Sequence, residues 1–242
     1  MCTVSYIPPQ NANGFILTSN RDERVQRDTI KPRLYSIGGM QLCFPQDVKA
    51  GGSWIAANNE GRLACLLNGG WDLHEKQPYH THSRGTVLID LVASRQEPMV
   101  FFSYYDLSHT EPFTVISIDI NGGVGISAFT EFIWDGSRKY LKNLDPHQSY
   151  LWSSVTLYSA AERKLRKEWF DRFLQEQSVN ITPELVHTFH TGKHTTDENI
   201  NLVMKRNEEL KTVSITQVTP EKGNFSMKYV DLVEKSTHIQ SV

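Results

Sequence analysis

The sequence predicts an α+β fold built mainly from antiparallel sheets. Four pairs of segments rich in β-forming residues are each joined by a short run of turn residues, which is typical of β-hairpins. Helical segments are grouped between these hairpins, and this pattern does not predict repeated βαβ units. The chain has 242 residues, 39% hydrophobic and 21% charged, which is enough for a single domain over residues 1–242 with one sizeable core.

The first hairpin joins residues 3–7 to residues 15–18. Residues 8–14 between them are Pro-Pro-Gln-Asn-Ala-Asn-Gly, a cluster of turn residues that ends one strand and starts the next. The following polar stretch, residues 24–31, predicts a loop. Short strands are expected after it, at residues 34–37 and 40–44.

Two more hairpins and a helix are predicted in the middle of the chain. Asn-Asn-Glu-Gly at residues 58–61 is a turn that separates two apolar strands. Ser83 precedes a segment with helical periodicity and is a candidate cap for it. The expected hairpins are residues 52–57 with 62–67 and residues 113–119 with 124–129, and the expected helix is residues 85–94.

The last third of the chain predicts two helices and a fourth hairpin. Ser159 and Glu162 form a capping box, and Thr182-Pro183 starts a shorter helix. Residues 212–219 and 225–233 make the final hairpin. Behind the capping box an apolar stripe opposes a basic face that we expect in solvent; the stripe is Leu165, Trp169, Phe170, Phe173 and Leu174, and the basic residues are Arg163, Lys164, Arg166, Lys167 and Arg172.

The first hairpin brings the start of the chain close to polar residues. If Ile7 pairs with Phe15, antiparallel registry puts Cys2 opposite Asn20, with Arg21 and Asp22 just beyond. Removal of Met1 would leave one residue with both a thiol and a free α-amine. Because an α-amine has a pKa of roughly 7.7–8.0, it can accept the thiol proton near neutral pH. The residues therefore indicate an N-terminal nucleophile; the alternative is that Cys2 merely opens a strand.

Several motifs give the sequence a family resemblance. Met-Cys-Thr-Val at residues 1–4, Asn-Arg-Asp-Glu at 20–23, Ala-Gly-Gly-Ser-Trp at 50–54 and Ser-Arg-Gly at 83–85 stand in this order. Together with residues 58–68 they resemble the NRDE family, also called the Transport and Golgi organisation protein 2 family. That resemblance implies a four-layer αββα sandwich of two mostly antiparallel sheets, as in N-terminal nucleophile hydrolases.

The resemblance also implies roles for individual residues. Asp22 would accept a hydrogen bond from the Cys2 amine, and Arg21 would lower the thiol pKa, unless Arg21 is only a structural ion-pair partner. Asn68 is the expected oxyanion donor; the alternative is a turn asparagine. The related cholylglycine hydrolases carry an arginine three places before the aspartate, where this chain has Ser19.

Four more residues are candidates for contact with substrate. Asn20 adjoins the expected site, and Arg84 is suited to an acidic substrate group or to anchoring the helix start. Ser154 lies in a segment where relatives have an asparagine, and Lys211 stands where an arginine is common. Both replacements leave the substrate, and turnover itself, open.

Composition excludes other functional classes. A formal charge of −2 gives no general attraction to nucleic acid, and no apolar stretch approaches the length of a membrane span. Three cysteines without metal-like spacing and the lack of a secretory signal predict a cytoplasmic protein. Histidines invite a zinc hypothesis, at His187, His190 and His194 or at His80 and His82. No motif such as His-Glu-x-x-His supports it, and we expect neither metal nor cofactor.

The favoured function is therefore hydrolysis or transfer of an acyl group at a non-peptide amide or a thioester, with Cys2 as nucleophile. The expected partner is a small acyl amide or thioester. The alternative is a non-catalytic protein that handles haem, acyl-CoA or lipid on the same fold, since a retained fold does not require retained catalysis. Cys2 or loop histidines would then be candidate haem ligands.

Overall fold

The computed structural model describes residues 3–10, 14–122, 125–177 and 180–242. Within these ranges the chain forms two antiparallel sheets. The first sheet has six strands, in the spatial order β10 (Tyr150–Ser153), β1 (Thr3–Ile7), β2 (Ile16–Arg24), β11 (Leu210–Glu221), β12 (Asn224–Asp231) and β13 (Ser236–Ser241). The first and last predicted hairpins thus share a sheet, where β2 pairs with β11.

The second sheet contains the strands from the middle of the chain. Its seven strands follow sequence order, as β3 (Thr29–Ile37), β4 (Met40–Asp47), β5 (Ile55–Asn58), β6 (Arg62–Asn68), β7 (Phe113–Ile120), β8 (Ile126–Trp134) and β9 (Lys139–Asn143). Each strand pairs with its neighbours in the chain. Most connections are short, but the one from β6 to β7 runs over residues 69–112 and contains both helices of this layer. The pairing of β5 with β6 and of β7 with β8 confirms the second and third predicted hairpins.

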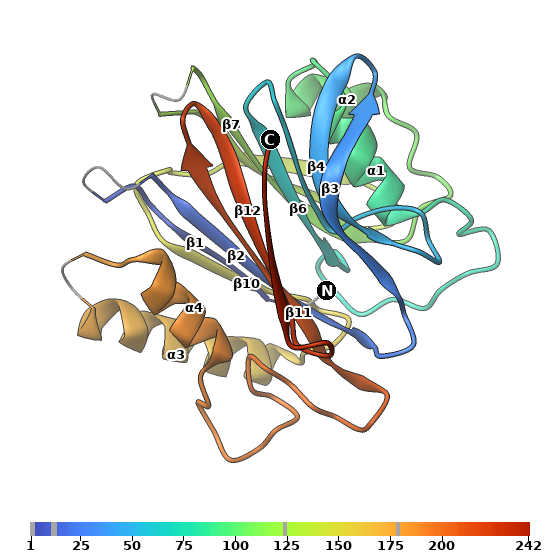
Figure 1. Cartoon of the computed structure of the whole chain (residues 1–242). Coiled ribbons are helices and arrows are strands. Elements are labelled where there is room, and N and C mark those ends of the chain that lie inside the picture. The colour runs from blue at the N-terminus through green and yellow to red at the C-terminus, as the bar shows by residue number, and fades with distance from the viewer. Residues whose placement is uncertain (1–2, 11–13, 123–124, 178–179) are drawn as a thin grey trace.

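Helices cover the outer faces of both sheets. Figure 1 shows α3 (Ala160–Glu176) and α4 (Pro183–Thr191) against the first sheet, and α1 (Arg84–Val92) and α2 (Pro98–Tyr104) beside the second. Contacts of α4 with β2 and β11, of α3 with β10, and of α1 with β5 and β6 agree with this view. The expected αββα sandwich is therefore present.

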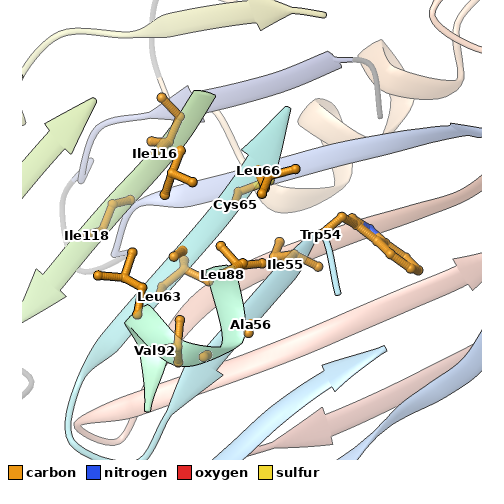
Figure 2. Packing of buried hydrophobic residues seen from close by; sticks show 14 of the residues in the cluster. Trp54, Ile55, Ala56, Leu63, Cys65, Leu66, Leu88, Val92, Ile116 and Ile118 are labelled. Atoms are coloured by element: carbon orange, nitrogen blue, oxygen red, sulfur yellow. The ribbon is translucent and has the colours of Figure 1, made fainter. Parts of the chain in front are cut away.

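Two apolar clusters hold the layers together. The larger one includes Val4 and Tyr6 of β1 together with buried residues of the second sheet and α1. Figure 2 shows part of it, with Leu88 and Val92 of α1 among residues of β5, β6 and β7. The smaller cluster joins Ile7 to α3 and α4. Alternate residues of β1 therefore face different layers, as the period of two in a strand requires.

Three of the four described helices start at the N-cap residue that the sequence predicted. The Ser159–Glu162 capping box at α3 has both of its hydrogen bonds, and the side chain of Thr182 accepts one from the Leu185 N–H at α4. Ser83 occupies the N-cap of α1 as expected, but its side chain makes no capping hydrogen bond. The fourth helix, α2, starts at Pro98 and was not predicted.

Several expectations about elements were wrong. The loop predicted at residues 24–31 is shorter than expected: β2 runs to Arg24 and β3 starts at Thr29, so only residues 25–28 lie outside the strands. The ladder between β3 and β4 shifts register between Ile30 and Arg33, and this irregularity accommodates Pro32 within a strand. The three edge strands β9, β10 and β13 were also not predicted.

Arg166 was wrongly assigned to the solvent face of α3. Its side chain is 0% exposed and lies between the helix and the first sheet. The position has the spacing of the apolar stripe, since Trp169, Phe170 and Phe173 follow it by three, four and seven residues. Helical geometry therefore buries it with that stripe.

No helix within the described ranges is both long and apolar enough to cross a bilayer.

Candidate functional site

The start of β1 lies between two other strands. Thr3 pairs with Asn20 of β2 on one side and with Ser153 of β10 on the other. The hairpin register is one residue away from the predicted one, because Ile7 pairs with Ile16 rather than with Phe15. Cys2, the predicted nucleophile, lies outside the described residues. The surroundings of Thr3 therefore define the candidate site.

Asp22 is a buried carboxylate held by two hydroxyl groups. It is 2% exposed. Tyr158 donates a 2.6 Å hydrogen bond to Oδ2, and Thr212 of β11 donates a 2.5 Å bond to Oδ1. Hydrogen bonds on both oxygens restrict rotation of the carboxylate and fix its direction. The carboxylate is thus oriented by groups from β11 and from the segment before α3.

A buried arginine connects Asp22's partner to the first strand. The guanidinium of Arg166 stacks over the Tyr158 ring at 3.4 Å from its centroid. The same group donates to the Thr3 hydroxyl, to the Asn201 carbonyl at 2.6 Å and to the Ile200 carbonyl at 3.1 Å. Because planar guanidinium groups combine stacking with directed hydrogen bonds, Arg166 fixes Tyr158 and Thr3 together. It is a residue of the site that sequence reasoning assigned elsewhere.

Arg21 lies on the opposite face of β2 from Asp22. It forms a 2.6 Å ion pair with Asp47, donates to Thr29 at 2.9 Å and stacks over Trp54 at 4.4 Å. Burial lowers the pKa of Arg21, against the opposing charge of Asp47. The side chain therefore faces the second sheet, and its charge is already shared with a carboxylate.

Asp47 is the shared partner of two arginines. Arg27 also contacts it, at 2.8 Å. Desolvation works to raise the pKa of Asp47, but hydrogen bonds from Arg27 and the Ala50 N–H and the charges of Arg27 and Arg21 hold it below its usual value. Asp47 therefore remains an anion between the sheets.

Asn68 stands at the end of β6 where two cavities meet. It lines a cavity of about 640 Å³ and a second one of about 390 Å³. Its main-chain carbonyl accepts a 2.7 Å hydrogen bond from Ser154, which is 1% exposed and also contacts Thr156 at 2.8 Å. Gly69 follows at φ +91°, and a Cβ there would lie 2.3 Å from Val155. Only glycine therefore allows this close approach of β6 to the end of β10.

The remaining predicted residues have different surroundings. Arg84, the first residue of α1, lines the smaller cavity and contacts Glu111 at 3.3 Å. Lys211 is half-buried and pairs with Glu23 across β11 and β2. Asn20 is 0% exposed: its amide donates to the carbonyls of His190 and Leu202, so it fastens α4 to the first sheet.

His190 is fully buried and both of its ring nitrogens have protein partners. Nε2 lies 2.6 Å from the Ser5 hydroxyl, and Nδ1 lies 2.6 Å from Oδ1 of Asn20. Burial lowers the pKa of His190 to about 3, so the ring is neutral at physiological pH. Neither nitrogen is available to a metal or haem. Within the described ranges, no group of three or more histidine, cysteine, aspartate or glutamate side chains is arranged to hold a metal ion.

Cys43 and Cys65 are unsuited to nucleophilic chemistry. Both are free thiols with 0% exposure. Burial raises the pKa of each to about 12, and a thiol in that state supplies almost no thiolate near neutral pH. Neither described cysteine competes with Cys2 for the predicted role.

Comparisons with known proteins agree with this architecture. A family model described as Transport and Golgi organisation 2 matches residues 1–238. No curated protein sequence matches the chain. Among solved structures, an N-acylethanolamine-hydrolyzing acid amidase ortholog from Caenorhabditis elegans is 13% identical, with a TM-score of 0.60 over 90% of this chain and 93% of that one.

Two bacterial structures are similar as well. A variant of conjugated bile acid hydrolase from Clostridium perfringens is 9% identical, with a TM-score of 0.58 over 100% of this chain and 96% of that one. Penicillin V acylase from Agrobacterium tumefaciens is 8% identical, with a TM-score of 0.55 over 100% of this chain and 86% of that one. At these identities, the similarity establishes a shared fold.

Proposed function

Because the chain belongs to the Transport and Golgi organisation 2 family, we propose that it is an N-terminal nucleophile hydrolase or acyltransferase with Cys2 as its nucleophile. The bond attacked is a non-peptide amide or a thioester. The structural neighbours are named as an amidase, a bile acid hydrolase and an acylase, which supports acyl chemistry on this fold. Removal of Met1 is the first requirement, since the mechanism uses the free amine of Cys2.

The position of Thr3 is the observation that carries the proposal. Thr3 pairs with Asn20 of β2 and with Ser153 of β10. If this antiparallel pairing continued by one residue, Cys2 would lie between Arg21 and Ser154. Its side chain would then share a face with Val4 and Arg21, toward the second sheet. Ser154 is bonded to Asn68, so the thiol would lie near the point where the two cavities meet.

The two faces of β2 would then divide the chemistry. The side chain of Asp22 lies on the face of β2 that is covered by α3. There it can accept a hydrogen bond from the Cys2 amine and orient the amine. The amine takes the thiol proton while sulfur attacks the acyl carbon, and a C–S bond forms. Asn68 stabilises the oxyanion of the tetrahedral intermediate. Because Arg21 is already paired with Asp47, its effect on the thiol is smaller than that of an unpaired cation.

The remaining steps restore the enzyme. The C–N or C–S bond of the substrate breaks, and the leaving group departs with the proton from the Cys2 amine. The product of this step is a thioester between the acyl group and Cys2. Water or another nucleophile then attacks the thioester, loses its proton to the amine and releases the acyl group, which regenerates the free thiol.

The test uses protein purified without an N-terminal tag. Intact mass should show loss of Met1, and a screen of acyl amides and acyl thioesters should give turnover that Cys2→Ala abolishes. A trapped acyl-enzyme should add the mass of the acyl group to wild-type protein only. Full retention of Met1, or equal turnover by Cys2→Ala, would exclude this mechanism. A haem absorption band that shifts on mixing, with no acylation of Cys2, would instead favour the binding protein.

A further inference from the structure

The two cavities that meet at Asn68 have opposite chemical character. The walls of the larger cavity include the apolar side chains Leu67, Ile133, Leu151, Trp152 and Val155. Its charged residues have partners within the protein. Four of them form pairs along α3, Lys164 with Glu168 at 3.8 Å and Lys167 with Asp171 at 2.7 Å. Arg163 donates to the Tyr158 carbonyl at 3.0 Å, and Glu131 of β8 accepts a 2.7 Å hydrogen bond from Trp152. This cavity is suited to an apolar acyl group, which gains free energy when it leaves water.

The smaller cavity has an excess of positive charge. Among the described residues that line it, five are arginine or lysine and three are carboxylates, with histidines counted as neutral. The cations are Arg21, Arg27, Lys49, Lys76 and Arg84, and the carboxylates are Glu23, Asp47 and Glu111. A cavity lined by two more cations than anions attracts a negatively charged group.

Among the three arginines that line this cavity, Arg84 has the longest contact with a carboxylate, since Arg21 and Arg27 lie 2.6 and 2.8 Å from Asp47. Its bonds are 3.3 Å to Glu111 and 3.4 Å to the Pro112 carbonyl, although charge-assisted bonds are usually about 2.7–2.9 Å long. Its side chain is only 18% exposed, and burial lowers its pKa. A guanidinium that is removed from water without short hydrogen bonds is poised to bind an anion.

Arg62 provides the comparison for a structural arginine in the same protein. It is also largely buried, but it binds Asp119 at 2.7 and 2.8 Å and the carbonyls of Ser94 and Gln96 at 2.8 and 2.7 Å. Its donors are satisfied within the protein. The longer contacts of Arg84 leave its guanidinium less fully hydrogen-bonded than that of Arg62.

From these observations we infer that the substrate is an N-acyl amino acid. Its apolar acyl chain lies in the larger cavity, its scissile carbonyl lies at Asn68, and the carboxylate of its amine half is bound by Arg84 in the smaller cavity. This inference rests on the proposed function, and it specifies the leaving group. On hydrolysis the C–N bond breaks, the amino acid departs with a proton on nitrogen, and water supplies the oxygen of the fatty acid.

The experiment compares two probes that differ only in charge, N-lauroylglycine and N-lauroylglycinamide. Wild-type protein should have a kcat/KM for the carboxylate about tenfold or more above that for the amide, as expected for a hydrogen-bonded charge pair. Arg84→Gln should bring this ratio close to one, mainly through KM, and Arg84→Lys should retain part of it. Arg95→Gln is the control, because Arg95 is an exposed arginine paired with Glu60. That variant should keep the wild-type ratio.

Binding measurements separate this inference from the proposed function. Calorimetry with Cys2→Ala measures the binding preference for N-lauroylglycine over its amide in the absence of turnover. This variant keeps Arg84, so the measurement remains possible if Arg84→Gln fails to fold. Equal kcat/KM for the two probes would overturn the inference and leave the hydrolase standing. Binding of N-lauroylglycine in preference to its amide, without turnover by wild type, would support the anion site and overturn the hydrolase. If N-lauroylglycine is neither bound nor turned over, the assigned substrate is wrong.

Discussion

Tyr158 donates a 2.6 Å hydrogen bond to Oδ2 of Asp22, although 136 positions separate the two residues in the chain. The ring of Tyr158 in turn lies under the guanidinium of Arg166, which bonds to Thr3. The carboxylate proposed to orient the nucleophile and the strand that bears the nucleophile are therefore held by one connected set of buried groups. Changes at any member should affect both stability and chemistry.

Replacing Tyr158 by phenylalanine removes one donor to a buried carboxylate. We expect Tyr158→Phe to lower the free energy of unfolding by about 1–3 kcal/mol, because Asp22 loses a bond that water cannot easily replace. Urea denaturation measures the change. Tyr35→Phe is the matched control, since the buried hydroxyl of Tyr35 has no hydrogen-bond partner within the described structure. Equal effects of the two variants would show that the bond to Asp22 contributes nothing specific.

Thiol labelling should distinguish Cys2 from the other two cysteines. Burial raises the pKa of Cys43 and Cys65 to about 12, so both thiols are protonated at pH 7.5, and both are inaccessible to the reagent. Iodoacetamide should therefore add one group quickly to native protein and three groups in urea, as read by intact mass. Cys2→Ala should show no rapid labelling in the native state. Slow labelling of all three thiols at one rate would contradict an activated Cys2.

Asn68→Ala should separate catalysis from binding. The bond from Ser154 goes to the main-chain carbonyl of Asn68, so the substitution retains it. Loss of a side-chain oxyanion donor should reduce kcat about a hundredfold to a thousandfold with little change in KM. Steady-state kinetics on a turned-over acyl amide make this measurement. A higher KM at constant kcat would mean that Asn68 only contacts the bound substrate.

Stability should fall in acid because of His190. Burial lowers its folded pKa to about 3 from the usual 6.5, so below pH 6.5 the unfolded chain binds a proton that the folded chain does not. The contribution is complete above pH 6.5 and decreases by about 1.4 kcal/mol per pH unit until pH approaches the folded pKa.

His190→Gln should flatten this part of the pH dependence, measured by urea denaturation between pH 5 and pH 8. The exposed His147 offers the control substitution, His147→Gln, which should leave the slope as it is in wild type. His187 also has a lowered pKa through burial, and the difference between wild type and variant isolates His190. An identical slope in His190→Gln would show that the buried ring is not the group that titrates.

The parts of the fold with strong local signals were predictable. The turn residues 8–14 predicted the first hairpin, and the Ser159 capping box predicted the start of α3, because both depend on neighbours in the chain. The hairpin register was one residue off, since a long turn does not fix pairing as a two-residue turn does. The edge strand β9 was missed because its side chains are exposed on both faces and show no alternation.

The site was predictable only in part, for a different reason. Asp22 and Asn68 could be proposed from the family resemblance, but their partners Tyr158, Thr212 and Ser154 lie far away in sequence. No local pattern indicates such contacts. Arg166 is the instructive case: its spacing placed it on the buried stripe, yet its charge suggested solvent. A charged side chain can be buried when it forms hydrogen bonds and packs against an aromatic ring. The partners of Arg166 come from distant parts of the chain, so only the folded structure reveals them.

The strand orders of the two sheets have a consequence for how the protein is made. The second sheet uses residues 29–143 in sequence order, so most of its strands pair with a strand made shortly before; the exception is β7, which pairs with β6 across residues 69–112. The first sheet is completed only when β10 and β11 reach the β1–β2 hairpin, and β11 supplies Thr212 to Asp22. A nascent chain that stops before residue 210 can form one complete sheet but lacks the machinery around Asp22. Assembly of the site therefore comes late, and an incomplete translation product remains without it.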